Sequence, residues 1–572
     1  MKKFKIAAVV TTAALALAAC SNSADTDKDT DKTTGSDTTA SATDSATTDA
    51  PSGASGVDYN PQPRENLKDG GTITMATAEI TAQANPFHQD GTLYTSQQFY
   101  WYNPQIALFD DEGTYVPNPD YLTKVEAKEV DGNTVVTFDI REEAVYNDGT
   151  PIDYTAFVNT WKSNNGTDEA YMPSSTDGYS KMKSVERGTS DKQAVVTYDG
   201  TYAWWQGQFN MLLHPKVDTA EKFNTMYLKA YQPDLGAGPF KVESVDFEKG
   251  EATFVPNEKW WGDKPKLEKF TYRQMESAAS LNAFLNGEID ATGVGNLERY
   301  TAVKNMDGIT IRTGFRPSNY LLTLNGASDN LKDIKVREAI FTAVDRKVIA
   351  DIQFQGLNYT ENAPGSFVLF ESQAGYEDNF GAVVKFDAEK SKALLEEAGW
   401  VAGADGIREK DGAKLSVRYV LLGDDATTKA VALAYQKMLK DVGVDMQIQE
   451  KPSSEFSNVY TTKDFDIFSL GFSSSDPFGV AYFGQIYRSD SGLNLSGTGT
   501  ADFDKKIDEL EKLATADEQI AKANELEKEA FALYGIMPTH NGPDMIAVKN
   551  GLSGVGSMGF AIVPKEDIGW EK

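Results

Sequence analysis

The sequence predicts an α/β protein with two or more lobes, and three observations support this. A chain of 572 residues exceeds what one compact hydrophobic core usually organises. Residues 415–472 alternate strand and helix patterns, which indicates a partly parallel sheet with helices packed on it. Residues 236–290 combine short strands with a helix that stops at Gly287. This last segment is a mixed α/β core segment, neither a repeat nor a membrane span.

Hydrophobic periodicity places the other elements. Alternating apolar residues predict strands, and apolar residues recurring every three or four positions predict helices. The expected strands are 71–76, 106–109, 134–140, 194–198, 240–245, 252–255, 267–272, 318–325, 415–422, 444–448 and 465–472. The expected helices are 154–162, 280–286, 331–351, 386–400, 427–442 and 502–534.

The N-terminus has the pattern of a bacterial export signal. Basic residues at 2–5 precede an apolar stretch at 6–16 that is too short to span a bilayer comfortably. The small residues before Cys20 resemble a lipobox, so we expect cleavage of a signal peptide at 1–19 and lipidation of Cys20. An ordinary signal peptide with a chance cysteine is the alternative. Lipidation would anchor the protein to the membrane without a span.

Residues 20–56 are expected to be a disordered linker. After Cys20 they consist mainly of Ser, Thr, Asp, Ala and Gly, without aromatic or branched aliphatic side chains before residue 57. Such a segment cannot bury enough apolar surface to offset the entropy of ordering. It predicts either a tether that keeps the folded part near the membrane or a passive spacer.

The composition excludes several classes of partner and site. A formal net charge of −30 disfavours nucleic acid and anionic lipid as partners. Cys20 is the one cysteine, so no disulfide can form within the chain. The three histidines, His88, His214 and His540, are far apart in sequence, so we expect no metal site and no cofactor.

Several stretches together resemble a known family. Residues 236–241 read GAGPFK, 257–267 read NEKWWGDKPKL and 285–290 read LNGEID. Residues 333–349 read DIKVREAIFTAVDRKVI and 386–400 read FDAEKSKALLEEAGW. In this order they resemble the extracellular solute-binding proteins of ABC importers, of the oligopeptide/dipeptide type (bacterial solute-binding protein family 5).

The resemblance implies a domain organisation. It implies a two-lobed periplasmic-binding-protein-like fold of type II, in the large cluster C form, with a hinge and an interlobe ligand cleft. Lobe I would comprise residues 57–314, with an extra subdomain at about 92–205. Lobe II would comprise 315–495, and residues 496–572 would return to lobe I.

The best candidate for ligand contact is the stretch 471–479, GFSSSDPFG, because its polar groups follow a buried strand. In peptide-binding relatives the corresponding stretch carries an acid that captures the ligand's α-ammonium. Here Asp476-Pro477 is kept, Ser474 stands at the earlier acidic position, and Phe472 replaces the usual Trp. The expected ligand contacts are Tyr94, Tyr320, Phe472, Ser473, Ser474 and Asp476.

Three interpretations of Asp476 stay open. It captures a ligand amine, or the ligand has no free α-amine and needs hydroxyl partners, or Asp476 only forms a turn before Pro477. No catalytic residue is expected, since the charged residues Arg337, Asp345 and Arg346 suit ion pairs on a helix surface. The chain also lacks a phosphate loop and the hydrolase motifs G-x-S-x-G and H-E-x-x-H.

The expected function is therefore a monomeric, non-enzymatic lipoprotein on the outer face of the cell membrane. It would capture oligopeptide-like solutes by hinge closure and deliver them to the permease subunits of an ABC transporter, whose ATPase is a separate subunit. The alternative is a lipoprotein of the same fold that acts in cell-envelope glycolipid synthesis. This alternative stays open because serines at 473–475 stand where peptide-binding relatives carry an acidic residue.

Overall fold

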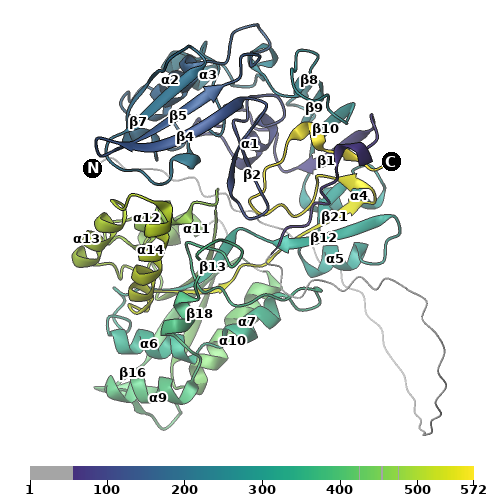
Figure 1. The fold of residues 1–572 in the computed structure, drawn as a ribbon. Helices are drawn as coiled ribbons and strands as arrows, with labels where there is room; N and C mark the ends of the chain where they lie inside the picture. Colours follow the sequence, from purple (N-terminus) through teal and green to yellow (C-terminus); the bar gives the residue numbers. More distant parts are fainter. Residues whose placement is uncertain (1–55, 424, 453–454, 475) are drawn as a thin grey trace, which may run out of the picture. The chain divides into compact units, whose positions relative to one another are not determined.

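The computed structural model describes residues 56–423, 425–452, 455–474 and 476–572. The predicted signal peptide, Cys20 and the linker up to residue 55 lie outside the described residues. Within the described ranges, the three largest sheets have seven, five and four strands (Figure 1). Helices pack on these sheets, which confirms the predicted α/β class.

The seven-stranded sheet is the core of lobe I. Strand β1 pairs in parallel with β10 and β11, whereas the neighbours farther out run antiparallel. Trp101 stacks on Phe270 in this core, with ring centroids 3.8 Å apart. In spatial order the strands are β12 (Ile309–Phe315), β21 (Pro543–Lys549), β11 (Ala291–Gly293), β1 (Thr72–Thr77), β10 (Lys269–Gln274), β9 (Glu251–Pro256) and β8 (Phe240–Asp246).

A four-stranded antiparallel sheet carries helix α2 (Tyr154–Asn164), which contacts β6 and β7 (Figure 1). Strand β5 alternates buried and half-buried residues along its length, as the pattern at 134–140 predicted. Asp153 caps α2 by accepting the N–H of Thr155. In spatial order the strands are β4 (Leu122–Val130), β5 (Asn133–Ile140), β7 (Gln193–Tyr198) and β6 (Met182–Arg187).

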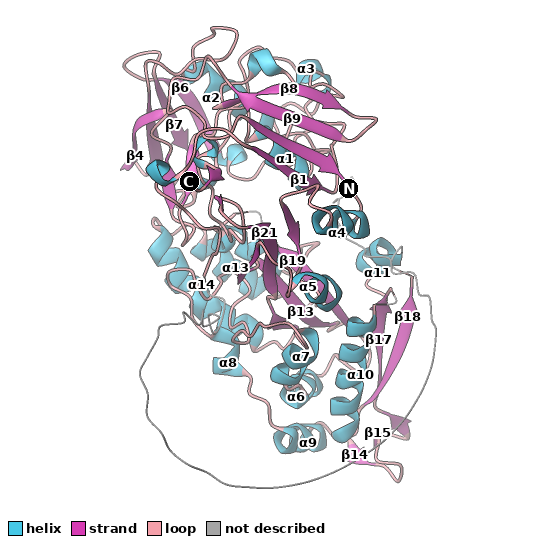
Figure 2. Ribbon diagram, turned by 90° about the vertical axis from the view of Figure 1, so that its right-hand side faces the viewer, coloured by secondary structure: helices cyan, strands magenta, loops and turns pink. Residues whose placement is uncertain are grey.

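The five-stranded sheet is the core of lobe II. Strand β17 pairs in parallel with β18 and β19, and α10 (Ala426–Asp441) connects β17 to β18 and packs beside them (Figure 2). This confirms the predicted β-α-β arrangement. In spatial order the strands are β18 (Asp445–Lys451), β17 (Ser416–Leu422), β19 (Ile467–Ser473), β13 (Ser318–Leu324) and β20 (Ile536–His540).

Two of the predicted long helices are each divided in two. The helix expected at 331–351 is α6 (Ile334–Ala343) followed by α7 (Arg346–Gln353). The helix expected at 502–534 is α13 (Ala501–Leu510) followed by α14 (Ala516–Phe531). A new N-cap causes each break: Asp345 accepts the N–H of Lys347, and Thr515 forms a capping box with Glu518.

The return of the chain to lobe I differs from the expected boundary at residue 496. The apolar side chains of α13 and α14 are buried in the lobe II core, and β20 is an edge strand of the five-stranded sheet. The next strand, β21, is the first to re-enter the seven-stranded sheet. The chain therefore crosses back at about residue 541, because the apolar face of α14 packs against lobe II.

Arg337, Asp345 and Arg346 do not form the expected surface ion pairs with other described residues. The buried guanidinium of Arg337 donates to the backbone carbonyls of Leu331, Lys332 and Leu533. Arg346 donates to the carbonyls of Pro364 and Pro538, at 2.6 and 3.0 Å. These arginines therefore tie helices α6 and α7 to neighbouring segments of lobe II.

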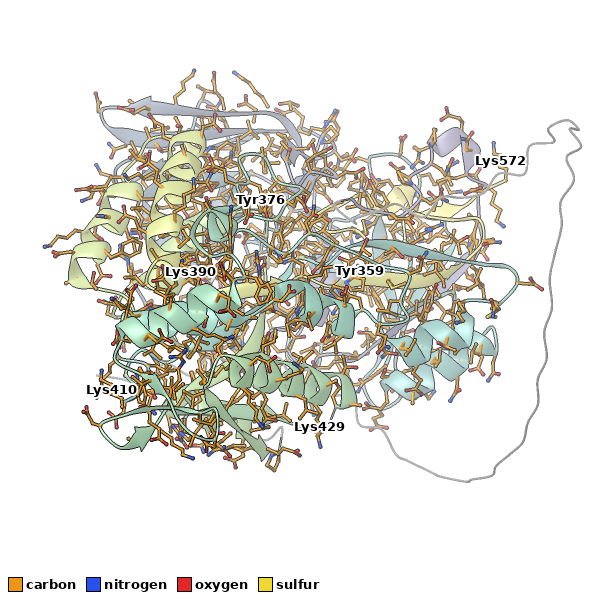
Figure 3. All side chains as sticks on the ribbon, turned by 90° about the horizontal axis from the view of Figure 1, so that it is seen from below. Tyr359, Tyr376, Lys390, Lys410, Lys429 and Lys572 are labelled. Atoms are coloured by element: carbon orange, nitrogen blue, oxygen red, sulfur yellow. The ribbon has the colours of Figure 1, made fainter. Side chains whose placement is uncertain are left out.

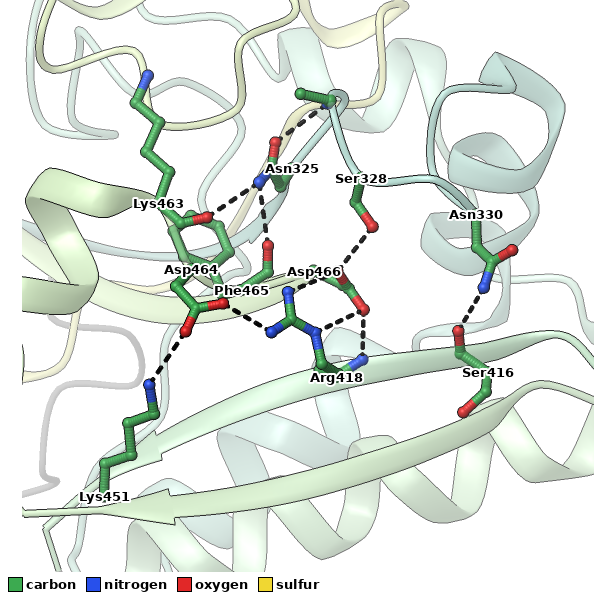
Figure 4. Close-up of polar contacts among 11 residues, drawn as sticks. Asn325, Ser328, Asn330, Ser416, Arg418, Lys451, Lys463, Asp464, Phe465 and Asp466 are labelled. Carbon is green, nitrogen blue, oxygen red and sulfur yellow. Dashed lines mark hydrogen bonds and ion pairs between the residues drawn. The ribbon is translucent and has the colours of Figure 1, made fainter.

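A polar network fixes the start of β19 (Figure 4). Asp466 is 8% exposed, and its carboxylate accepts the backbone N–H of Arg418 at 2.8 Å and the hydroxyl of Ser328 at 2.7 Å. The Arg418 guanidinium also reaches Asp466 and, at 2.7 Å, the more exposed Asp464. Asn325 donates to the carbonyls of Lys463 and Phe465, so β17, β19 and the turn after β13 are held together.

Replacing Asp466 by asparagine should lower the free energy of unfolding by about 1–3 kcal/mol, because an amide cannot accept from all the donors that face both oxygens. Chemical denaturation of the variant and the wild type measures this change. Asp464→Asn is the matched control: its side chain is 54% exposed, so the loss should stay below about 1 kcal/mol. Equal losses in both variants would contradict the assignment.

Candidate functional site

The candidate site begins where β19 ends. This strand is nearly continuously apolar because it lies at the centre of the five-stranded sheet, between β17 and β13. Beyond it we define the Asp476 loop as residues 476–482, which includes the short helix η6 (Gly479–Tyr482) and leads into α12 (Phe483–Tyr487). Polar groups of this loop therefore emerge at the end of a buried strand, where open sheets commonly bind ligands.

The carboxylate of Asp476 is fixed by two hydrogen bonds. One oxygen accepts the backbone N–H of Phe478 at 2.8 Å, and the other accepts the hydroxyl of Tyr482 at 2.6 Å. The first bond is the turn-forming role that the Asp-Pro pair suggested. The second bond goes beyond a turn, because it orients the carboxylate toward a tyrosine six residues ahead.

Tyrosines from both lobes lie within electrostatic reach of Asp476. Burial, and then the charge of Asp476, raise the pKa of Tyr100 to about 12. Burial is also the main cause that raises the pKa of Tyr202 and of Tyr482, and the Asp476 carboxylate adds to both shifts. Tyr100 follows α1 (Leu93–Phe99) and Tyr202 follows β7, so the charge of a lobe II carboxylate acts on tyrosines of lobe I.

The serine run lies against the hinge. Ser473 Oγ is 2.9 Å from Ser318 Oγ, and the N–H of Ser474 donates to the carbonyl of Pro317 at 2.9 Å. The ring of Phe472 packs edge-to-face on Phe367, with centroids 5.5 Å apart. These three predicted ligand contacts therefore have partners within lobe II and the strand that enters it.

The two predicted tyrosine contacts are not brought together with Asp476. Tyr320 stacks on His540 with centroids 4.5 Å apart and 6° between the planes, and it pairs with Gly471 across β13 and β19. Since neighbouring residues of a strand point to opposite faces, Tyr320 and Phe472 lie on opposite faces of the sheet. Tyr94 lies in the first turn of α1 and forms no hydrogen bond or ring contact with the described residues of the Asp476 loop.

Within the described ranges, two chain segments cross between the lobes, at 315–318 and at 540–543, and side chains tie them together. Asn541 donates to the Ser318 carbonyl and to Asn319, both at 2.7 Å. Glu361 accepts the N–H groups of Asn541 and Gly542 and the hydroxyl of Tyr359, and burial raises its pKa. Tyr359 and Tyr376 mark the segment between α7 and α8 (Asn379–Val383) that supplies this contact (Figure 3).

The sequence did not single out Tyr100, Tyr202 and Tyr482. Tyr100 belongs to the aromatic run at 99–102, where core packing was the better expectation for any one ring. Tyr482 lies six residues after Asp476, a spacing that one turn and a short helix can bridge. The contact between these two residues could therefore have been predicted from the sequence. Tyr202 carried no signal, because its approach to Asp476 depends on how the lobes meet.

The described part of the chain adds two findings on other kinds of site. No group of three or more His, Cys, Asp or Glu side chains comes together there as metal ligands. No helix within the described ranges combines the length and apolar character needed to cross a bilayer.

Two α/β lobes joined by two crossing segments, with a polar loop of one lobe facing the other, define a two-lobed solute-binding protein of the periplasmic type. A family model described as "Bacterial extracellular solute-binding proteins, family 5 Middle" matches residues 116–494. The chain belongs to this family. Its predicted role as a substrate-binding protein of an ABC importer is thereby confirmed, because the family consists of such proteins.

The relatives agree with this assignment. An oligopeptide-binding protein OppA of Mycobacterium tuberculosis is 33% identical over 520 residues, covering 90% of this chain and 87% of that protein. The nickel-binding periplasmic protein of Escherichia coli is 25% identical over 466 residues, covering 78% and 84%. The relatives lend no support to the envelope-assembly alternative.

Solved structures show the same fold. The periplasmic EDTA-binding protein EppA superposes with a TM-score of 0.80 at 23% identity, covering 90% of this chain and 98% of that one. The oligopeptide-binding protein AppA of Bacillus subtilis, solved with a nonapeptide, superposes with a TM-score of 0.66 at 19% identity, covering 88% and 100%. The predicted two-lobed fold is therefore confirmed.

Proposed function

We propose that this protein captures peptides with a free amino terminus between its lobes and delivers them to an ABC permease without chemically changing them. The observation that carries the proposal is the Asp476 carboxylate at the end of β19, which accepts the Tyr482 hydroxyl and whose charge acts on Tyr100 and Tyr202 of lobe I. The oligopeptide-binding relatives support this ligand class. The hinge closure itself is part of the proposal.

The chemistry of the Asp476 loop suits an ammonium group. An ammonium carries three donors and one positive charge, and its burial between two lobes needs a fixed carboxylate. Asp476 supplies the charge, and Tyr482 holds its orientation. The hydroxyls of Tyr100 and Tyr202 stay protonated near it, so they can accept or donate without adding a second charge.

The anchoring of the protein is part of the same proposal. Lipidation at Cys20 would keep a monomer on the outer face of the membrane, and the linker to residue 56 would let the lobes reach the permease. Mass spectrometry of the mature protein from its native membrane tests this point. A diacylated N-terminal Cys20 supports it, whereas an unmodified N-terminus at another residue contradicts it.

Ligand identification is the experiment that tests the function. The protein should carry peptides through gentle purification, and after their removal it should retain peptides from a random pool of tri- to octapeptides. Mass spectrometry of the bound fraction identifies them. If neither step yields peptides, the proposed ligand class is wrong. Any other molecule that copurifies would then be the candidate ligand.

A further inference from the structure

Trp204 joins the two lobes at a point away from the hinge. Its segment follows β7 of the four-stranded sheet, yet its side chain is 8% exposed and belongs to the hydrophobic core of lobe II. Its ring lies against Phe478 of the Asp476 loop, with centroids 6.0 Å apart. The next residue, Trp205, instead packs with the four-stranded sheet, edge-on to Tyr115. Two adjacent tryptophans therefore pack into different lobes.

Hydrogen bonds accompany this packing. The indole N–H of Trp204 donates to Oε1 of Gln519 in α14, at 2.7 Å. Gln519 is 3% exposed, and its Nε2 donates to the carbonyl of Leu513, so its oxygen is fixed toward Trp204. The hydroxyl of Thr201 donates to the carbonyl of Lys512 at 3.1 Å. In both bonds the donor belongs to the segment after β7 and the acceptor to lobe II.

A contact of this kind can separate without leaving a buried polar atom unpaired. When the lobes part, the indole N–H of Trp204, the Gln519 oxygen and the Lys512 carbonyl reach the surface together, and water replaces each partner. The apolar face of the Trp204 indole is then part of the surface that opening exposes. The contact is therefore suited to being made and broken.

Phe478 connects this contact to the candidate ligand site. Its backbone N–H donates to Asp476, while its ring lies near Trp204 on one side and near Phe109 of lobe I on another, with centroids 5.9 Å from Phe109. Pro477 lies against Gly113 so closely that a β-carbon at Gly113 would be 3.0 Å from Pro477 Cβ. The position of Asp476 is thus coupled to the packing of Trp204 through the adjacent residues of one loop.

We propose that Trp204 and Gln519 form an interlobe latch that sets the balance between closed and open forms, and that they act as positioning residues without touching the ligand. The inference rests on the proposed function only where it concerns ligand affinity. A protein whose binding-competent form is less populated binds more weakly by the same factor. Weakening the latch should therefore reduce affinity in proportion to the lost closed population.

The test compares Trp204→Phe with Trp205→Phe. The first removes the indole donor and part of the ring that contacts lobe II, and the second removes the same atoms on the lobe I side. Small-angle X-ray scattering of the ligand-free protein should show a larger radius of gyration for Trp204→Phe alone. Hydrogen–deuterium exchange should rise in residues 201–208 and 512–520, and a penta-alanine peptide, used as the probe, should bind about tenfold more weakly.

Gln519→Leu provides an independent arm from the other lobe. It should produce the same expansion, and the double variant with Trp204→Phe should add little, because both remove one contact. Equal behaviour of Trp204→Phe and Trp205→Phe, or an unchanged Gln519→Leu protein, would overturn the proposal. If the wild type does not bind penta-alanine, the scattering and exchange results still decide the latch, so its failure is distinguishable from failure of the proposed function.

Discussion

Replacing Asp476 by asparagine should weaken the binding of peptides with a free amino terminus by about 2–5 kcal/mol, which is at least about thirtyfold in Kd. The asparagine oxygen can still accept the N–H of Phe478, so the turn is preserved and the charge is lost. An ammonium enclosed between the lobes would then lack its counter-charge. Isothermal titration calorimetry with penta-alanine measures the change.

N-acetylated penta-alanine separates the interpretations of Asp476. If Asp476 captures the amine, the wild type should bind the acetylated peptide weakly, and Asp476→Asn should change that binding little. An equal loss for both peptides would assign Asp476 to loop structure alone. Asp177→Asn is the matched control, because Asp177 is another acid close to Tyr202 but belongs to lobe I. It should bind free penta-alanine within about a factor of two of the wild type, as expected for a more distant charge.

The fold could be predicted because several motifs of the chain resemble those of a known family. The paired tryptophans at 260–261 are an example, since both pack on Tyr121, with centroids 5.6 and 5.4 Å away, and Trp261 donates to the Asp120 carbonyl. Both rings are therefore part of the packed scaffold of lobe I. The Trp261–Asp120 bond joins residues 141 positions apart, so this motif predicted the fold through its resemblance to the family and not through local structure.

The helix breaks show where periodicity misleads. Val344 and Val348 continue the apolar spacing of α6 across Asp345, and this favoured one helix over two. The helix nevertheless ends there, because Asp345 accepts the free N–H of Lys347 and so stabilises the start of a new helix, α7. Thr515 does the same before α14. In each case the cap residue was visible in the sequence and deserved more weight than the apolar spacing.

The site could be predicted only in part, because it depends on register and on contacts between distant segments. The stretch that contains Asp476 was predicted as the ligand site because a buried strand ends there, and this stays a prediction. The grouping of Tyr320 with Phe472 was not justified, because only the pairing of Tyr320 with Gly471 reveals that their side chains point to opposite faces. Tyr202 approaches Asp476 across the lobes, and no pattern in the sequence encodes that approach.

Acidification should destabilise the hinge side of lobe II through His540. This residue is 7% exposed, and burial lowers its pKa to about 3, whereas a histidine of the unfolded chain titrates near 6.5. The hydroxyl of Thr539 donates to the Tyr320 carbonyl at 3.0 Å, so Nδ1 of His540 carries the proton and donates to Thr539. Protonation at Nε2 would then place a buried N–H where no described residue accepts it.

The direction in which stability changes with pH follows from the order of the two pKa values of His540, in the folded and in the unfolded chain. As the pH falls below about 6.5 the unfolded chain takes up the proton first, so stability from neutral His540 is complete above that pH and is lost toward about pH 3. The free energy of unfolding changes by up to about 1.4 kcal/mol per pH unit, so the protein should lose about 2 kcal/mol of stability between pH 6.5 and 5. Urea denaturation at several pH values measures it.

His540→Phe is the matched variant, because phenylalanine keeps the stack on Tyr320 and the edge contact with Phe354 but cannot take up a proton. The acid-induced loss of the wild type should exceed that of the variant by about 2 kcal/mol over the same interval. Other groups, including Glu361, titrate in both proteins, so the difference isolates the imidazole. Parallel stability curves would show that His540 is not the sensitive group. Because His540 directly precedes Asn541 and Gly542, whose N–H groups bind Glu361, the lost stability should appear first as faster amide exchange at the hinge crossing.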